Sequence, residues 1–224
     1  MPVFSILGDA DPMVQVKLTQ NELICCESGA MVMMESNLDL DGTMGGGIMQ
    51  AAVRKLANGE SFFQQRIRAT RGDGMCLLAP KLPGAVKMVD VGSVQYRVSD
   101  GAYLAASQHV TLTSRMQGIG KALFANTGGF FVIETSGTGQ MAVAGFGVIV
   151  SMDVSAGKEI TVDNGHVVAW DSRMQYEVSL STTRNQGAVG KLVNSVISGE
   201  MAVLKFRGPG KLLLCSRNRN TFGR

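Results

Sequence analysis

The sequence has few histidines and no long apolar run, and each shortage argues against a class of protein. Its 224 residues include two histidines, His109 and His166, which form no His-x-His pair. A cupin-type metal centre needs several histidines and a carboxylate that converge on one ion, so we expect no metal site. No window approaches about 18 uninterrupted apolar residues, so we expect no membrane-spanning helix.

Targeting signals and paired cysteines are also lacking. The first residues, 1–11, show no basic segment followed by an apolar run, which argues against a secretory signal or a transit peptide. The four cysteines, Cys25, Cys26, Cys76 and Cys215, have no zinc spacing. We therefore expect reduced, buried thiols in a cytoplasmic protein.

Motifs for catalysis and for phosphate binding are missing as well. There is no Gly-x-Ser-x-Gly elbow, and no cysteine has the surroundings of a known nucleophile. The run Gly118–Ala122 resembles a phosphate loop, but Arg115 stands where a glycine is needed and Ala122 where Ser or Thr would hold magnesium. A net charge of +3 is too small to indicate nucleic acid by itself. We expect no catalytic residues and no cofactor.

Glycine is abundant, with 28 residues, and it marks a repeat. A Gly-x-Gly unit between two apolar runs occurs at 72–74, 137–139 and 208–210, and we read each as a tight hairpin. A second set of turns, each centred on one glycine, shows a similar period of about 70 residues. The predicted structural turns are Gly29, Gly74, Gly101, Gly139, Gly165 and Gly210.

Alternating residues between these turns predict strands. Val14–Leu18 alternates apolar and polar residues, Leu23–Cys26 is a second strand, and Met174–Leu180 is the clearest case. The fold class we predict is all-β, with triplicated β-sandwich modules packed around a pseudo-threefold axis and joined by short helical connections. The three copies span approximately residues 1–84, 85–149 and 150–224.

A glycine-rich and apolar segment follows the alternating strands in each copy. In the first copy, Met44 to Gly59 should be the most mobile large segment, with some apolar side chains partly exposed. These segments either plug the core between copies or present a surface to a partner. The candidate interaction surface consists of Gly45, Gly46, Gly47, Ile48, Met49, Val53, Lys55, Lys121 and Lys191.

Several segments carry a resemblance that covers nearly the whole chain. They are Ser28–Val32, Met44–Gly47, Gly59–Phe63, Leu78–Gly84, Asp100–Ala105 and Asn164–Trp170. In order and spacing they resemble the altered-inheritance-of-mitochondria family, formerly a domain of unknown function. The resemblance implies a β-sandwich similar to the tryptophan RNA-binding attenuation protein, in three internal copies. The fungal member is associated with the mitochondrial inner membrane and its cristae-organising complex, and the family offers no catalytic motif.

The first function hypothesis is a non-enzymatic scaffold or interaction protein, with membrane organisation as the role that the family resemblance implies. Its partner would be another protein or a second copy, bound through exposed sheet edges or the glycine-rich segments, and a membrane surface is a further candidate. The alternative is a small-ligand or RNA-binding β module, although the net charge disfavours nucleic acid. An enzyme ranks third.

Overall fold

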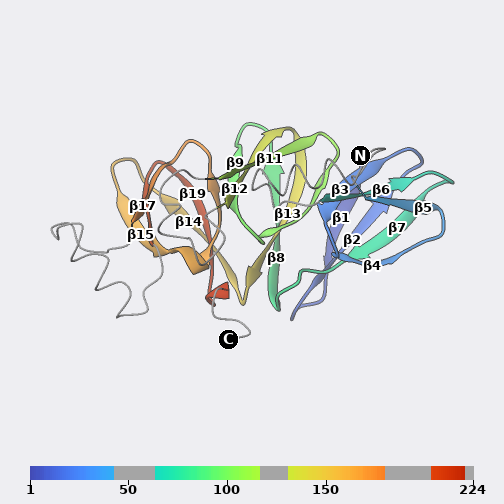
Figure 1. Ribbon diagram of the computed structural model, residues 1–224, viewed down its shortest axis with the longest axis horizontal. Coiled ribbons are helices and arrows are strands. Elements are labelled where there is room, and N and C mark those ends of the chain that lie inside the picture. Colours follow the sequence, from blue (N-terminus) through green and yellow to red (C-terminus); the bar gives the residue numbers. More distant parts are fainter. Residues whose placement is uncertain (43–63, 117–130, 180–202, 220–224) are drawn as a thin grey trace.

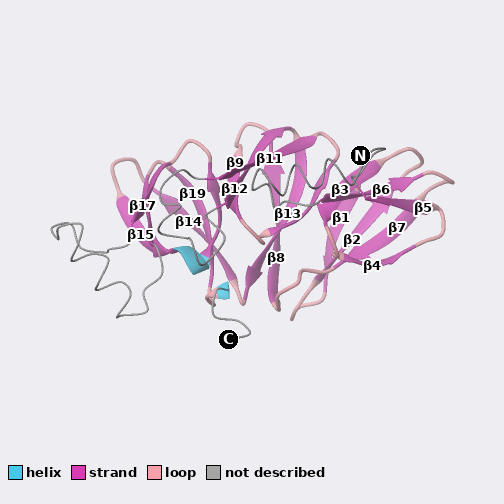
Figure 2. Cartoon of the chain, viewed as in Figure 1, coloured by secondary structure: helices cyan, strands magenta, loops and turns pink. Residues whose placement is uncertain are grey.

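The structure is a computed structural model that describes residues 1–42, 64–116, 131–179 and 203–219 (Figure 1). Strands make up most of these residues, and a 3-10 turn at Asn164–His166 is a short exception (Figure 2). The predicted all-β class is confirmed. The expected helical connections lie outside the described residues.

The strands form four antiparallel sheets. The first contains, in spatial order, β1 (Val3–Leu7), β2 (Met13–Leu18), β7 (Gly74–Leu78) and β4 (Met31–Met34). The second contains β5 (Leu38–Gly42), β6 (Gln64–Ala69), β3 (Leu23–Glu27), β10 (Tyr103–Ser107), β13 (Gly139–Phe146) and β8 (Gly84–Val91). The third contains β11 (Val110–Met116), β12 (Phe131–Gly137), β9 (Tyr96–Ser99), β16 (Val167–Asp171), β19 (Gly210–Cys215) and β14 (Ile149–Val154). The fourth contains β15 (Glu159–Asp163), β18 (Val203–Arg207) and β17 (Gln175–Ser179).

Local sequence explains the strands that were predicted. In β2, Val14, Val16 and Leu18 are buried and Lys17 between them is exposed, as a period of two requires. The same alternation buries Val178 of β17, and Met174 just before it. Strands β2, β3 and β17 therefore confirm the strands expected from alternation.

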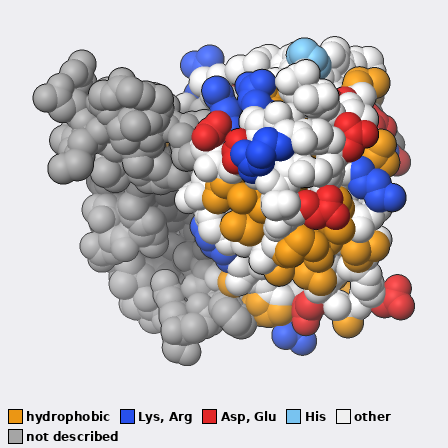
Figure 3. Space-filling model, turned by 90° about the vertical axis from the view of Figure 1, so that its right-hand side faces the viewer, with side chains coloured by type: hydrophobic (Ala, Val, Ile, Leu, Met, Phe, Trp, Pro, Cys, Tyr) orange, Lys and Arg blue, Asp and Glu red, His pale blue; other side chains and the backbone are white. Residues whose placement is uncertain are grey.

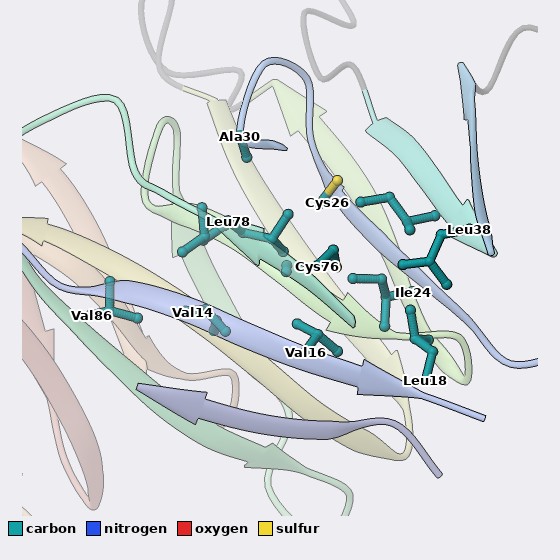
Figure 4. Close-up of a cluster of buried hydrophobic side chains, with 14 of the residues drawn as sticks. Val14, Val16, Leu18, Ile24, Cys26, Ala30, Leu38, Cys76, Leu78 and Val86 are labelled. Carbon is teal, nitrogen blue, oxygen red and sulfur yellow. The ribbon is translucent and has the colours of Figure 1, made fainter. Parts of the chain in front are cut away.

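The sheets follow one another along the long axis, with the first at one end and the fourth at the other (Figure 1). A cluster of buried side chains fills the space between each pair of successive sheets. In the first cluster, Val16 of β2 packs with Ile24 of β3 (Figure 4). The two inner sheets therefore carry core residues on both faces where they overlap their neighbours.

The pairing order of the strands recurs along the chain. The trios β2–β7–β4, β8–β13–β10 and β14–β19–β16 share one order, and β3–β6–β5, β9–β12–β11 and β15–β18–β17 share another. Two junctions join these trios into the six-stranded sheets, because β10 pairs with β3 and β16 pairs with β9. Strand β8 begins at Gly84 and β14 at Ile149, near the expected boundaries. The three-copy division, its likeness to the tryptophan RNA-binding attenuation protein and the pseudo-threefold axis stay predictions.

The glycine turns are not hairpins, which corrects the sequence interpretation. Strands β6 and β7 flank the Gly72–Gly74 turn but lie in different sheets, and the same holds for β12 and β13 and for β18 and β19. Neighbouring loops hold the first of these turns, since Asp73 accepts hydrogen bonds from the Gln20 amide at 2.8 Å and from Asn37 at 3.0 Å. The chain crosses between two facing sheets here because the strands on both sides must bury apolar residues in one shared core.

Candidate functional site

The sequence-predicted interaction surface lies outside the described residues. This holds for Gly45, Gly46, Gly47, Ile48, Met49, Val53, Lys55, Lys121 and Lys191, and for the predicted mobility of 44–59. The proposal that they contact a partner stays a prediction.

The predicted turn glycines all lie at or beside strand ends. Gly29, Gly101 and Gly139 have positive φ angles of 83°, 72° and 146°. Gly165 lies within the 3-10 turn, and Gly74 and Gly210 begin β7 and β19. Their positions fit a structural role, because they shape connections between sheets.

Strand β4 is an apolar strand at the free edge of the first sheet. Its sequence is Met-Val-Met-Met, and it pairs with β7 on one side only among the described strands. Val32 is 53% exposed and Met33 is 38% exposed. Figure 3 looks onto this end of the molecule, where hydrophobic side chains gather in one area among charged ones. An uncovered apolar edge strand is a ready template for another strand.

The strands that correspond to β4 are fully covered. Every residue of β10 and of β16 is buried. The correspondence is close, since each of the three strands has a β-bulge at its second residue when paired with β7, β13 or β19. The run Met31–Met34 gives no sign in the sequence that this strand lies at an edge.

Strands β15 and β14 also lie at sheet edges. Strand β15 ends the fourth sheet, and its outer side has no partner among the described strands. Strand β14 ends the third sheet and exposes apolar side chains at and beside it, namely Val148, Val150 and Met152. The described surface is therefore apolar at several sheet edges.

The ionisable groups in the described part serve structural contacts. Glu134 bridges Arg97 at 3.0 Å and Arg115 at 2.6 Å. Burial opposes ionisation of Glu134, but hydrogen bonds from the two arginines outweigh it and lower the pKa of this carboxyl. Asp171 accepts hydrogen bonds from Arg173, which lower the pKa of its carboxyl. Both carboxylates are committed to ion pairs that tie strands or turns together.

Two of the described thiols are buried among apolar side chains, and both histidines have a polar neighbour. Burial raises the pKa of the Cys26 and Cys76 thiols to about 12, so they stay protonated near neutral pH. His166 Nδ1 lies 2.8 Å from the Cys215 carbonyl oxygen, and His109 Nε2 lies 3.0 Å from the Gln108 amide nitrogen. Within the four described ranges, no group of His, Cys, Asp and Glu side chains could hold a metal ion.

A small pocket lies where segments of all three parts of the chain meet. Glu27, Lys81, Phe146, Cys215 and Arg219 are among its lining residues, and its volume is about 10 Å³. That volume is close to the space of one water molecule. Lys81 and Glu27 form an ion pair of 2.7 Å at this place, so these two side chains already have partners. The pocket offers no room for an organic ligand.

Comparisons with known proteins show which family the chain belongs to. A family model described as Mitochondrial biogenesis AIM24 matches residues 4–217. The chain belongs to this family. An uncharacterised protein of Streptococcus pyogenes serotype M6 is 33% identical over 217 residues, covering 94% of this chain and 84% of its own length.

A solved structure is similar along the whole chain. The crystal structure of a protein from Streptococcus pyogenes, SPYM3_0169, superposes with a TM-score of 0.83 at 31% identity, covering 99% of this chain and 96% of the other. The fold of this chain is therefore shared with a protein solved by crystallography. Among the described residues, no helix is long and apolar enough to cross a membrane.

Proposed function

We propose that this chain is a non-catalytic interaction protein whose apolar edge strand β4 binds a partner strand. The observation that carries the proposal is β4, an apolar edge strand whose Val32 and Met33 are exposed while the matching residues of β10 and β16 are buried. Exposed apolar surface of this kind marks interaction sites in folded proteins. Pairing of one strand with another would supply main-chain hydrogen bonds, and the alternate side chains would supply specificity.

The other features of the described part support an interaction role over an enzyme or a ligand-binding module. Its carboxylates pair with arginines, its most strongly perturbed thiols have raised pKa values, and its pocket holds about 10 Å³. An activated nucleophile would need a lowered pKa, and a ligand site would need a volume of roughly 300 Å³ or more. A scaffold role is compatible with the family's description, and organisation of a membrane-associated complex stays part of the proposal.

A capture experiment in the native host tests the proposal. Tagged wild-type protein, a Val32→Lys/Met33→Lys variant and a Met152→Lys control are purified, and the retained proteins are identified by mass spectrometry. We expect specific partners with the wild type and with Met152→Lys, and their loss with the β4 variant. The proposal is wrong if the set of retained proteins is the same for all three, or if β4 substitutions change nothing while a chemical activity is found.

A further inference from the structure

Two free edges correspond to the strands that join the trios inside the six-stranded sheets. Strands β10 and β16 each pair on their outer side with a strand of the preceding part of the chain, β3 and β9. Strand β4 has the position of β10 and β16, but no described strand pairs with its outer side. Likewise, β15 has the position of β3 and β9, and no described strand pairs with its outer side. One half of the same junction is therefore present at each end of the molecule.

The two internal junctions define a register. Ala105 of β10 lies opposite Cys26 of β3, and Ala169 of β16 lies opposite Val98 of β9. All four side chains are 0% exposed. Opposite residues on an antiparallel pair share one face of the sheet, so each pair forms part of the core between two sheets.

The same register can be assigned to the two free edges. Met33 pairs with Leu77 as Ala105 pairs with Ala142, directly after the bulge. Val162 stands three residues before Gly165, as Cys26 and Val98 stand three residues before Gly29 and Gly101. Met33 thus corresponds to Ala105 and Ala169, and Val162 to Cys26 and Val98.

We propose that β4 of one copy pairs antiparallel with β15 of a second copy, with Met33 opposite Val162. This inference rests on the proposed interaction function and names a second copy of the chain as the partner. Met34 then lies opposite Thr161, and Glu35 lies opposite Ile160. No like charges face each other across the three pairs.

The cores support this pairing. In the first cluster, Leu104 and Ala105 of the following part of the chain fill the space beside β3. Val168 and Ala169 do the same beside β9 in the second cluster. In the third cluster, Ile160 and Val162 of β15 are only partly buried. Val32 and Met33 of a second copy would cover them, as their counterparts do in the other two clusters.

The geometry makes the assembly head-to-tail. Strand β4 lies at one end of the long axis and β15 at the other, so one chain does not pair its own two edges (Figure 1). A contact between two different surfaces closes into a ring or continues as an open chain of copies. Two copies that exchange both edges would form the smallest such ring, a closed dimer with two identical junctions.

Sedimentation velocity over a range of protein concentrations tests the proposal. Wild type should form dimers or larger species as concentration rises, and Met33→Lys should weaken association at least about tenfold, because an ammonium would enter an apolar core. Met152→Lys is the matched control, since Met152 of β14 is 40% exposed against 38% for Met33. It should associate as wild type does. Val32→Lys provides a second β4 variant, and thermal melting verifies that each variant is folded.

Three results would overturn the inference: a wild type that is monomeric at all concentrations, Met33→Lys and Val32→Lys that associate normally, or Met152→Lys that alone abolishes association. Failure here is distinguishable from failure of the proposed function. If the chain is monomeric but captures other proteins through β4, the proposed interaction role holds and only the pairing with a second copy is wrong.

Discussion

The hydroxyl of Tyr103 in β10 donates a hydrogen bond of 2.7 Å to the backbone carbonyl oxygen of Cys25 in β3. The two residues are 78 positions apart in the sequence and belong to the junction that joins two trios of strands in the second sheet. A side chain thus reinforces the backbone ladder where two parts of the chain meet. At the free edge, Met31 takes the corresponding place in β4 and carries no hydroxyl.

Tyr103→Phe should lower the free energy of unfolding by about 1 to 2 kcal/mol, because a buried carbonyl oxygen loses its side-chain donor. Tyr96→Phe is the control, since Tyr96 is also a buried tyrosine. Urea denaturation of both variants measures the difference. Equal decreases in the free energy of unfolding for the two variants would show that the hydrogen bond to Cys25 does not stabilise the junction.

Gly139→Ala should destabilise the protein much more than Gly101→Ala. An added Cβ at Gly139 would overlap the Ser107 hydroxyl oxygen, which accepts a hydrogen bond from the Gln140 amide at 2.8 Å. Gly101 also has a positive φ, but a Cβ there would meet open space among the described residues. We expect the free energy of unfolding to fall by about 1 kcal/mol in Gly101→Ala and by at least about 2 kcal/mol in Gly139→Ala. Similar melting temperatures for the two variants would contradict this account.

Asp171 should make folding sensitive to acid. Its hydrogen bonds with Arg173 lower the pKa of the carboxyl in the folded state, so the native protein binds this proton less readily than the unfolded chain. The resulting stability is present above the unfolded pKa of about 3.9 and is lost as pH falls through the lower, folded pKa. Asp171→Asn should therefore be less stable than wild type at pH 7, and the difference between their free energies of unfolding should decrease below about pH 4.

Denaturant titrations at several pH values check this, with Asp153→Asn as a control for removing an exposed carboxylate. A gap between wild type and Asp171→Asn that stays constant from neutral to acid pH would show that the ion pair has no part in acid sensitivity.

The buried thiols should react slowly in the folded protein. Burial raises the pKa of Cys26 and Cys76 to about 12, so the thiolate that attacks an alkylating reagent is scarce. Iodoacetamide at mildly alkaline pH should label these two residues only after denaturation, as followed by mass spectrometry of peptides. Rapid labelling of Cys26 or Cys76 in native protein would instead indicate an open or reactive thiol site.

Much of the fold could be predicted from short-range patterns. Alternation at Val14, Val16 and Leu18 is a local signal, and the spacing of turn glycines matches the recurrence of strand pairing. The partners of each strand could not be predicted. A turn such as Gly72–Gly74 reverses the chain whether the next strand pairs beside the last one or crosses to the facing sheet.

The candidate site was less visible in the sequence. Met31–Met34 is as apolar as Tyr103–Ala106, and only the topology makes the first an exposed edge and the second a buried centre. The glycine-rich segments around Gly45, Lys121 and Lys191 were the more conspicuous candidates, and they lie outside the described residues. Edge strands escape sequence reasoning because exposure at an edge depends on which neighbour is missing.

Crosslinking of two single-cysteine substitutions tests the central claim most directly. One chain carries Met33→Cys in β4 and the other carries Val162→Cys in β15, and a short bifunctional thiol reagent is added to each alone, to their mixture and to wild type. Because opposite residues in a strand pair have Cβ atoms about 5 Å apart, the mixture should give a covalent dimer that neither variant and no wild-type sample gives. Dimers with Met33→Cys alone, or no product specific to the mixture, would contradict the pairing of β4 with β15.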